Sequence, residues 1–92
     1  MSCVYTIYGF EGCRFFMNAL QLLKQILVKN PKHCKVVVKV VPYSEWQKLL
    51  NETHTKYKNT KNHKTSPLIL KDAAYLGGHD NLVEYIKKNK LL

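Results

Sequence analysis

The chain has 92 residues, the size of a single small domain, and leaves no room for a second domain or a large enclosed cavity. Hydrophobic residues make up 46% and charged residues 23% of the sequence, values that exclude wholesale disorder. The net charge is +9, but of the 15 lysines and arginines only Arg14 is an arginine. Arginine commonly reads bases and phosphates, so this ratio argues against a nucleic-acid partner.

The composition also bears on source and location. Lysine and asparagine share A/T-rich codons, which fits a parasite, a symbiont or a large DNA virus. No apolar stretch approaches the ~20 residues that span a bilayer, and Met1–Val4 lacks the features of a signal peptide. We therefore expect a cytoplasmic protein without a membrane partner. Cys3, Cys13 and Cys34 are odd in number and far apart, so we expect free thiols and no disulfide framework.

The first half of the chain predicts a strand–helix–strand unit. Val4–Tyr8 is β-branched and aromatic and ends at Gly9, as in a buried strand. Arg14–Val28 has apolar residues at helical spacing and precedes a proline, which predicts a helix. Lys35–Val41 is nearly continuous in valine, a pattern typical of a strand buried on both faces in a parallel pair.

The second half predicts a helix, a hairpin and a last helix. Ser44–Gln47 fits a capping box, and Asn51–Lys64 is polar, like a helix tail that leads into an exposed loop. Pro67–Leu70 and Ala73–Leu76 predict paired antiparallel strands, and Asp80 is expected to cap the last helix. The order β-α-β-α-β-β-α over residues 1–92 predicts one α/β domain, a four-stranded mixed sheet flanked by about three helices.

Cys13 stands apart from the other cysteines by its position. It follows the first predicted strand and the short loop Gly9–Gly12, and it opens the first helix. Free backbone N–H groups and the positive end of the helix dipole favour a thiolate there. Arg14 adds cationic potential, which Glu11 partly opposes. The alternative is an unreactive cysteine buried at the helix start, because free cysteine is often buried.

Two further segments have both a purely structural and a functional interpretation. Thr65-Ser66-Pro67 precedes a strand, where proline is tolerated; it is either an ordinary trans proline or a cis one that turns the Ser66 backbone toward the first helix. Gly77-Gly78-His79-Asp80 precedes the last helix. This segment is either a simple turn or an anion site formed by free amides at the helix start.

Together these segments resemble the glutaredoxins of the thioredoxin-fold superfamily, over about residues 4–88. The family pattern is a Cys-Pro-Tyr-Cys-type motif opening the first helix, then Thr-Val-Pro, then Gly-Gly with an acidic residue shortly after. The matching places here are Cys13-Arg14-Phe15-Phe16, Thr65-Ser66-Pro67 and Gly77-Gly78-His79-Asp80. The resemblance implies a thioredoxin-like fold and a cis peptide bond before Pro67.

The resemblance also implies glutathione-dependent thiol–disulfide exchange, with glutathione as co-substrate and glutathionylated proteins as partners. Cys13 is implied to be the nucleophile, which takes up glutathione and is released by a second glutathione. The Ser66 backbone is implied to pair with the cysteinyl part of glutathione, and Asp80 with the nearby amides to hold its γ-glutamyl end. The other residues implied to border the glutathione groove are Arg14, Phe15, Thr65, Pro67, Gly78 and His79.

Three departures from the family pattern shape the functional prediction. Phe16 stands in place of the second cysteine, which leaves only a monothiol route. Phe10 replaces the usual lysine three residues before the cysteine, and Arg14 or a lysine of Lys56–Lys64 is left to substitute for it. The motif is also not the Cys-Gly-Phe-Ser of iron–sulfur glutaredoxins, and the bulky Arg14 and Phe15 disfavour a bridging cluster.

Several alternatives remain at this stage. Three interpretations are open: a catalytic monothiol protein, a glutathione- or protein-binding module that has lost catalysis, and an iron–sulfur carrier. We expect no other metal, because the histidines and cysteines lack zinc-site spacing. Cys34 is expected to pack near the core; a redox role for Cys34, or an accessory thiol role for Cys3 near the terminus, is the less favoured alternative. The lysines of Lys56–Lys64 form either a solvated loop or a surface that attracts an anionic ligand.

Overall fold

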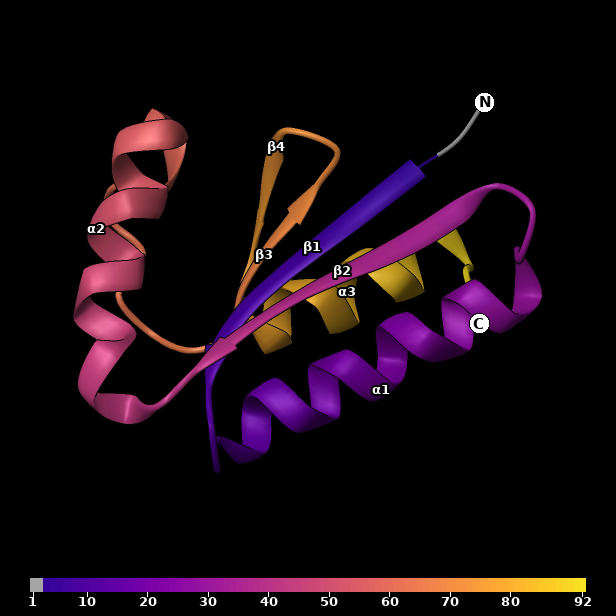
Figure 1. The fold of residues 1–92 in the computed structure, drawn as a ribbon. Helices are drawn as coiled ribbons and strands as arrows, with labels where there is room; N and C mark the ends of the chain where they lie inside the picture. Colours follow the sequence, from indigo (N-terminus) through magenta and orange to yellow (C-terminus); the bar gives the residue numbers. More distant parts are fainter. Residues whose placement is uncertain (1–2) are drawn as a thin grey trace.

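The computed structural model describes residues 3–92 and contains the elements in the predicted order (Figure 1). Met1 and Ser2, on which the signal-peptide prediction partly depends, lie outside the described residues. The strands are β1 (Cys3–Phe10), β2 (Cys34–Val41), β3 (Leu68–Lys71) and β4 (Ala74–Gly77). The helices are α1 (Arg14–Lys29), α2 (Trp46–Lys56) and α3 (His79–Asn89), and short 3₁₀ turns at Tyr43–Glu45 and Lys58–Thr60 flank α2.

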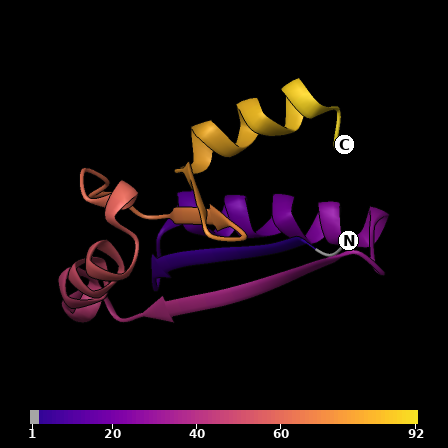
Figure 2. The same ribbon diagram turned by 90° about the horizontal axis from the view of Figure 1, so that it is seen from above.

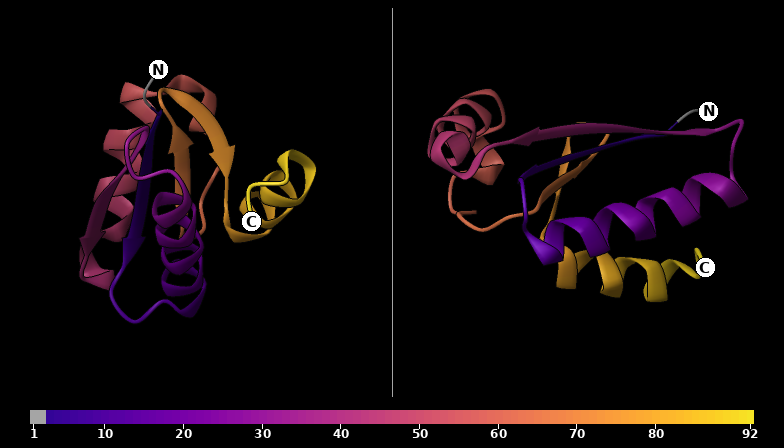
Figure 3. Two further views of the ribbon diagram at one scale, coloured as in Figure 1. Left: turned by 90° about the vertical axis from the view of Figure 1, so that its right-hand side faces the viewer. Right: turned by 60° about the horizontal axis from the view of Figure 1, so that its bottom comes forward.

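The strands form the predicted four-stranded mixed sheet over the described residues, in the order β2-β1-β3-β4. β1 runs parallel to β2 and antiparallel to β3, and β3 runs antiparallel to β4. Helices α1 and α3 lie together against one face of the sheet, whereas α2 lies at the end where β1 and β2 finish (Figures 2 and 3). This arrangement confirms the four-stranded mixed sheet that the element order predicts, and it agrees with the thioredoxin-like fold that the resemblance implied.

The core consists of two clusters on opposite faces of the sheet, because successive strand side chains point to opposite sides. On the face of α1 and α3, Tyr5 and Ile7 of β1 pack with buried residues of those helices. On the other face, Tyr8 packs with Trp46 and Leu50 of α2. The buried residues of the first cluster are Tyr5, Ile7, Phe16, Ala19, Leu23, Ile26, Ile69, Leu82 and Ile86.

Strand β2 is more exposed than its valine-rich sequence predicts. Val37, Val38 and Val40 are 39%, 42% and 44% exposed, so the prediction of a strand buried on both faces was wrong. β2 is the outer strand and pairs with β1 on one side only, and the helices cover it incompletely. β-Branched residues suit a pleated surface whether or not both faces are covered.

The start of α2 also differs from the prediction. Ser44 lies within a 3₁₀ turn, and Glu45 occupies the N-cap position of α2 without a side-chain capping hydrogen bond. The predicted capping box at Ser44–Gln47 was therefore wrong. Trp46 begins the helix, and its indole N–H donates to the carbonyl oxygen of Lys64 at 3.4 Å. Burial of this indole against Tyr8 in the second cluster places the helix start.

Cys3 and Cys34 form a disulfide, so the expectation that they are free thiols was wrong. The parallel register places Cys3 directly opposite Cys34, with their Cα atoms 4.6 Å apart, a separation suited to a disulfide. Both cysteines also pack against the first cluster. The bridge therefore joins the beginnings of the two parallel strands.

No helix among residues 3–92 is both long and apolar enough to cross a membrane.

Candidate active site

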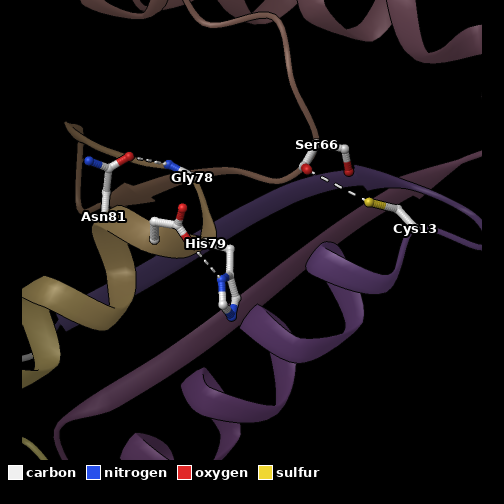
Figure 4. A network of polar contacts seen from close by, with 6 residues as sticks. Cys13, Ser66, Gly78, His79 and Asn81 are labelled. Carbon is white, nitrogen blue, oxygen red and sulfur yellow. Dashed lines mark hydrogen bonds and ion pairs between the residues drawn. The ribbon is translucent and has the colours of Figure 1, made fainter.

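Cys13 occupies the N-cap of α1, just beyond the end of β1. Gly12 makes the turn between strand and helix with a φ of +83°, a conformation that favours glycine. The thiol is half-buried, and its Sγ atom donates a hydrogen bond to the carbonyl oxygen of Ser66 at 3.6 Å (Figure 4). The helix start and the segment before β3, 53 residues apart in the chain, thus meet at this sulfur.

Phe16, at the place of the family's second cysteine, is a core residue. Its side chain is only 5% exposed and belongs to the first cluster. The ring lies against Gly9, and a Cβ atom added to Gly9 would overlap it. The close approach of α1 to β1 at this point therefore depends on the pair of Phe16 and Gly9.

The bonded cysteines lie too far away to act on Cys13. Cys3 begins β1 and Cys13 follows its end, and an eight-residue strand spans about 23 Å at ~3.3 Å per residue. Cys34 is bonded to Cys3 at that same distant end. Cys13 is the free cysteine of the described residues, and no other cysteine reaches it within the chain.

His63 braces the segment that faces Cys13. Its Nε2 atom lies 2.7 Å from the carbonyl oxygen of Thr65 and 2.9 Å from that of Pro67. Carbonyl oxygens only accept, so Nε2 carries a proton and donates to both. On its other side, Nδ1 is hydrogen-bonded to the hydroxyl of Tyr75. Burial raises the pKa of Tyr75, which keeps its hydroxyl protonated. Within the segment, the Ser66–Pro67 peptide bond is cis.

The start of α3 is capped differently from the prediction. The helix begins at His79 with Gly78 at the N-cap, and the Gly78 N–H donates to Oδ1 of Asn81 at 3.0 Å. The predicted cap, Asp80, was therefore wrong, because Asn81 lies in the position that reaches back to Gly78. The carboxylate of Asp80 is exposed and contacts Nδ1 of His79 at 3.2 Å. Gly77 has a φ of +129°, and a side chain there would overlap Asn81.

A groove of about 500 Å³ lies between the segment before β3, the start of α3 and Phe15. It brings together most of the residues that the sequence predicted for the site. These are Phe15, Thr65, Ser66, Pro67, Gly78, His79 and Asp80. The ring of Phe15, on α1, lies 5.7 Å from that of His79, on α3, and so joins the two helices across the groove. Arg14 is exposed and does not line the groove, and Cys13 adjoins it only through its contact with Ser66.

Sequence reasoning missed four residues that line the groove, Asn62, His63, Tyr75 and Asn81, and did not single out Lys64 within its loop. Lys64 does belong to the lysine-rich loop that was considered as a source of a substitute cation. His63 had a weak sequence signal, since it lies four residues before Pro67. Nothing in the sequence links Tyr75 to the groove, because its contact with His63 requires the β3–β4 hairpin.

Phe10, at the place of the family's usual lysine, points to the opposite face of the sheet. Its ring lies 4.8 Å from that of Tyr43 and 5.7 Å from that of Trp46, and it packs against the second cluster. An aromatic residue at this position therefore helps to hold α2 against the sheet and leaves Lys64 as the cation that lines the groove.

Residues 3–92 contain no group of three or more histidine, cysteine or acidic side chains placed to hold a metal ion.

Comparisons with known proteins show what this fold resembles. No family model matches the sequence, and the curated proteins contain no match to it. Among solved structures, the chain is similar to glutaredoxin 1 from Francisella tularensis, whose crystal structure was determined in complex with cacodylate. The TM-score is 0.69 and the sequence identity is 21%, and the match covers 97% of this chain and 98% of that one.

Two further glutaredoxins are also similar. One is from E. coli, with a TM-score of 0.65 and 18% identity over 94% of this chain and 95% of that one. The other is a dithiolic glutaredoxin from Trypanosoma brucei brucei, with a TM-score of 0.63 and 24% identity over 95% of this chain and 80% of that one. At these identities the likeness establishes the fold.

Proposed function

We propose that the protein catalyses glutathione-dependent thiol–disulfide exchange by a monothiol route, and that it removes glutathione from glutathionylated proteins in the cytoplasm. The observation that carries this proposal is the position of Cys13: its sulfur lies at the start of α1, 3.6 Å from the Ser66 carbonyl oxygen, where Ser66 forms a wall of the groove. The glutaredoxin fold supports a thiol–disulfide function in general.

The groove offers groups that match the parts of glutathione. The first amides of α3, at His79 and Asp80, have no acceptor within the helix and suit the γ-glutamyl carboxylate. The exposed carboxylate of Asp80 suits the γ-glutamyl amine. The backbone of Ser66 suits the cysteinyl part, and Lys64, which also lines the groove, suits the glycyl carboxylate.

The chemistry proceeds in two exchanges. In the first, the Cys13 thiolate attacks the glutathione sulfur of a protein–glutathione disulfide; a Cys13–glutathione disulfide forms, and the protein thiolate leaves and takes a proton from solvent. In the second, a glutathione thiolate, formed by loss of its proton, attacks the glutathione sulfur of that disulfide. Oxidised glutathione forms and the Cys13 thiolate is restored. Overall, the protein–glutathione disulfide and one free glutathione give the protein thiol and oxidised glutathione, so the protein cysteine is reduced and one glutathione thiol is oxidised.

Phe16 explains why the route is monothiol. A second cysteine one turn into α1 is the usual group that resolves a mixed disulfide, and here that place belongs to the core. Because Cys3 and Cys34 lie at the far end of β1, the mixed disulfide at Cys13 has to be released by an external thiol.

The test is reduction of a glutathionylated peptide by glutathione, measured for the wild type, Cys13→Ser and the double variant Cys3→Ser/Cys34→Ser. We expect activity in the wild type and the double variant and at least ~100-fold less with Cys13→Ser, because the nucleophile is lost. We also expect one glutathione to attach to Cys13 after mild oxidation, seen by mass spectrometry. An inactive wild type, or equal rates with Cys13→Ser, contradicts the proposal. Glutathione binding without turnover identifies the chain as a binding module instead.

A further inference from the structure

The hydroxyl of Ser66 is buried and has no hydrogen-bond partner among the described residues. Most buried hydroxyls are paired, because a buried polar group that lacks a partner costs free energy. Two buried threonines follow this rule: the Thr53 hydroxyl donates to the Leu49 carbonyl at 2.8 Å, and the Thr60 hydroxyl donates to the Tyr57 carbonyl at 2.7 Å. The orphaned hydroxyl of Ser66 therefore needs an explanation in the chemistry of the site.

Ser66 is also the residue that Cys13 contacts. The Cys13 thiol donates to the Ser66 carbonyl oxygen, and Figure 4 shows the Ser66 hydroxyl pointing to the side where the Cys13 sulfur lies. A carbonyl oxygen accepts a hydrogen bond from a thiol but has no hydrogen to donate to a thiolate, so this contact favours the protonated sulfur. A hydroxyl can rotate to donate, and the one that Ser66 carries is uncommitted.

We propose that the Ser66 hydroxyl donates a hydrogen bond to the Cys13 sulfur when that sulfur is negatively charged. The hydroxyl is unpaired while Cys13 is a thiol and gains an acceptor when the proton leaves, so it stabilises the thiolate relative to the thiol. In turnover the same bond assists Cys13 both as attacking group and as leaving group; this second part rests on the proposed function. Ser66 then acts through its side chain in addition to its backbone.

Other titratable groups lie on the elements around Cys13. Glu11 and Arg14 belong to its own loop and helix, His63 and Lys64 precede Ser66, and His79 and Asp80 begin α3. Within the described residues, the hydrogen bond of Cys13 Sγ is made with Ser66. A substitution that removes only the Ser66 hydroxyl leaves all these other groups in place. Any change in the ionisation of Cys13 can then be assigned to the hydroxyl and not to those groups.

The experiment measures the rate of Cys13 alkylation by iodoacetamide as a function of pH. Cys3 and Cys34 are bonded to each other, so Cys13 is the thiol that reacts in the wild type and in each variant. We expect Ser66→Ala to slow alkylation at neutral pH about three- to ten-fold and to move the midpoint of the pH profile upward. The rate at high pH, where the sulfur is fully ionised, is expected to stay near the wild-type value. Ser44→Ala, the same change at an exposed serine of a 3₁₀ turn, is the matched control and is expected to keep the wild-type profile.

Thermal unfolding separates this role from a structural one. Removing an unpaired buried hydroxyl is expected to leave the melting temperature of Ser66→Ala equal to or above that of the wild type. A wild-type pH profile for Ser66→Ala overturns the proposal, as does a loss of rate at every pH together with a lower melting temperature. Alkylation needs no glutathione, so a shifted profile in a protein without deglutathionylation activity upholds the role of Ser66 and refutes the proposed function.

Discussion

The two ends of β1 hold sulfur in different states. At the beginning of the strand, Cys3 is bonded to Cys34 of the parallel neighbour. Beyond the other end, Cys13 is a free thiol at a helix start, facing a groove wall. Backbone context accounts for the contrast: pairing in register brings two Cβ atoms together, whereas the strand-to-helix turn leaves a single cysteine beside unpaired amides. The disulfide end is thus closed, whereas the Cys13 sulfur stays a free thiol beside Ser66, which lines the groove.

Replacing Phe16 by cysteine is expected to have the largest effect, at the Cys13 end. The change creates the missing second cysteine but removes a core ring that lies on Gly9. Because truncating a buried phenylalanine costs about 3–5 kcal/mol, we expect a loss of that order in the free energy of unfolding by urea. Met17→Cys, at an exposed neighbouring position, is the control and should change stability by no more than about 0.5 kcal/mol. A Phe16→Cys protein as stable as the wild type contradicts the role of Phe16 in the core.

Removing the disulfide is the next largest change and acts at the opposite end. The bridge closes a loop with a sequence separation of 31, for which chain entropy predicts about 3–4 kcal/mol of stabilisation. We expect Cys3→Ser/Cys34→Ser to lose that amount in urea unfolding and to keep the wild-type rate of Cys13 alkylation. Reductant should destabilise the wild type and leave the double variant unchanged. A large change in Cys13 reactivity would show that the two ends are coupled.

Alkaline pH also tests the disulfide end, through Tyr5. Burial, and then the hydrogen bond with Tyr85, raise the pKa of Tyr5 to about 12. Since an unfolded tyrosine ionises near pH 10, the contribution of Tyr5 to stability is constant below pH 10 and is lost between pH 10 and pH 12. The expected loss is about 2–3 kcal/mol, measured by urea unfolding against pH. Tyr5→Phe should flatten this slope, and Tyr43→Phe, an exposed control, should not; equal slopes in all three proteins would refute the assignment.

The smallest expected effect comes from His63 at the groove. His63→Ala removes hydrogen bonds to Thr65, Pro67 and Tyr75, so the wall that faces Cys13 loses its brace. We expect about 1–2 kcal/mol less stability and roughly three- to ten-fold weaker glutathione binding by calorimetry. His33→Ala, an exposed histidine, serves as control. Unchanged glutathione binding in His63→Ala would separate the brace from the ligand site.

The parts that the sequence predicted well are those that depend on local patterns. Strand, helix and turn signals placed every strand and helix in order, and the three motifs predicted most of the groove wall. The errors concern contacts between distant segments. The register that pairs Cys3 with Cys34, the uncovered side of β2 and the contact of Tyr75 with His63 all depend on tertiary packing. The helix-cap error is different: Asn81 was as suitable a capping group as Asp80, and only the backbone at Gly78 decides between them.

The unpaired edge of β2 indicates a role for two of the lysines that the net charge alone did not suggest. An outer strand presents unpaired N–H and C=O groups, and one rich in exposed valines is a template for adding strands from other molecules. Lys35 and Lys39 interrupt the valine run, and both are exposed. Two approaching copies of this strand bring like charges together, which opposes sheet growth between chains. Lysine within this exposed strand edge therefore opposes aggregation through the edge of the sheet.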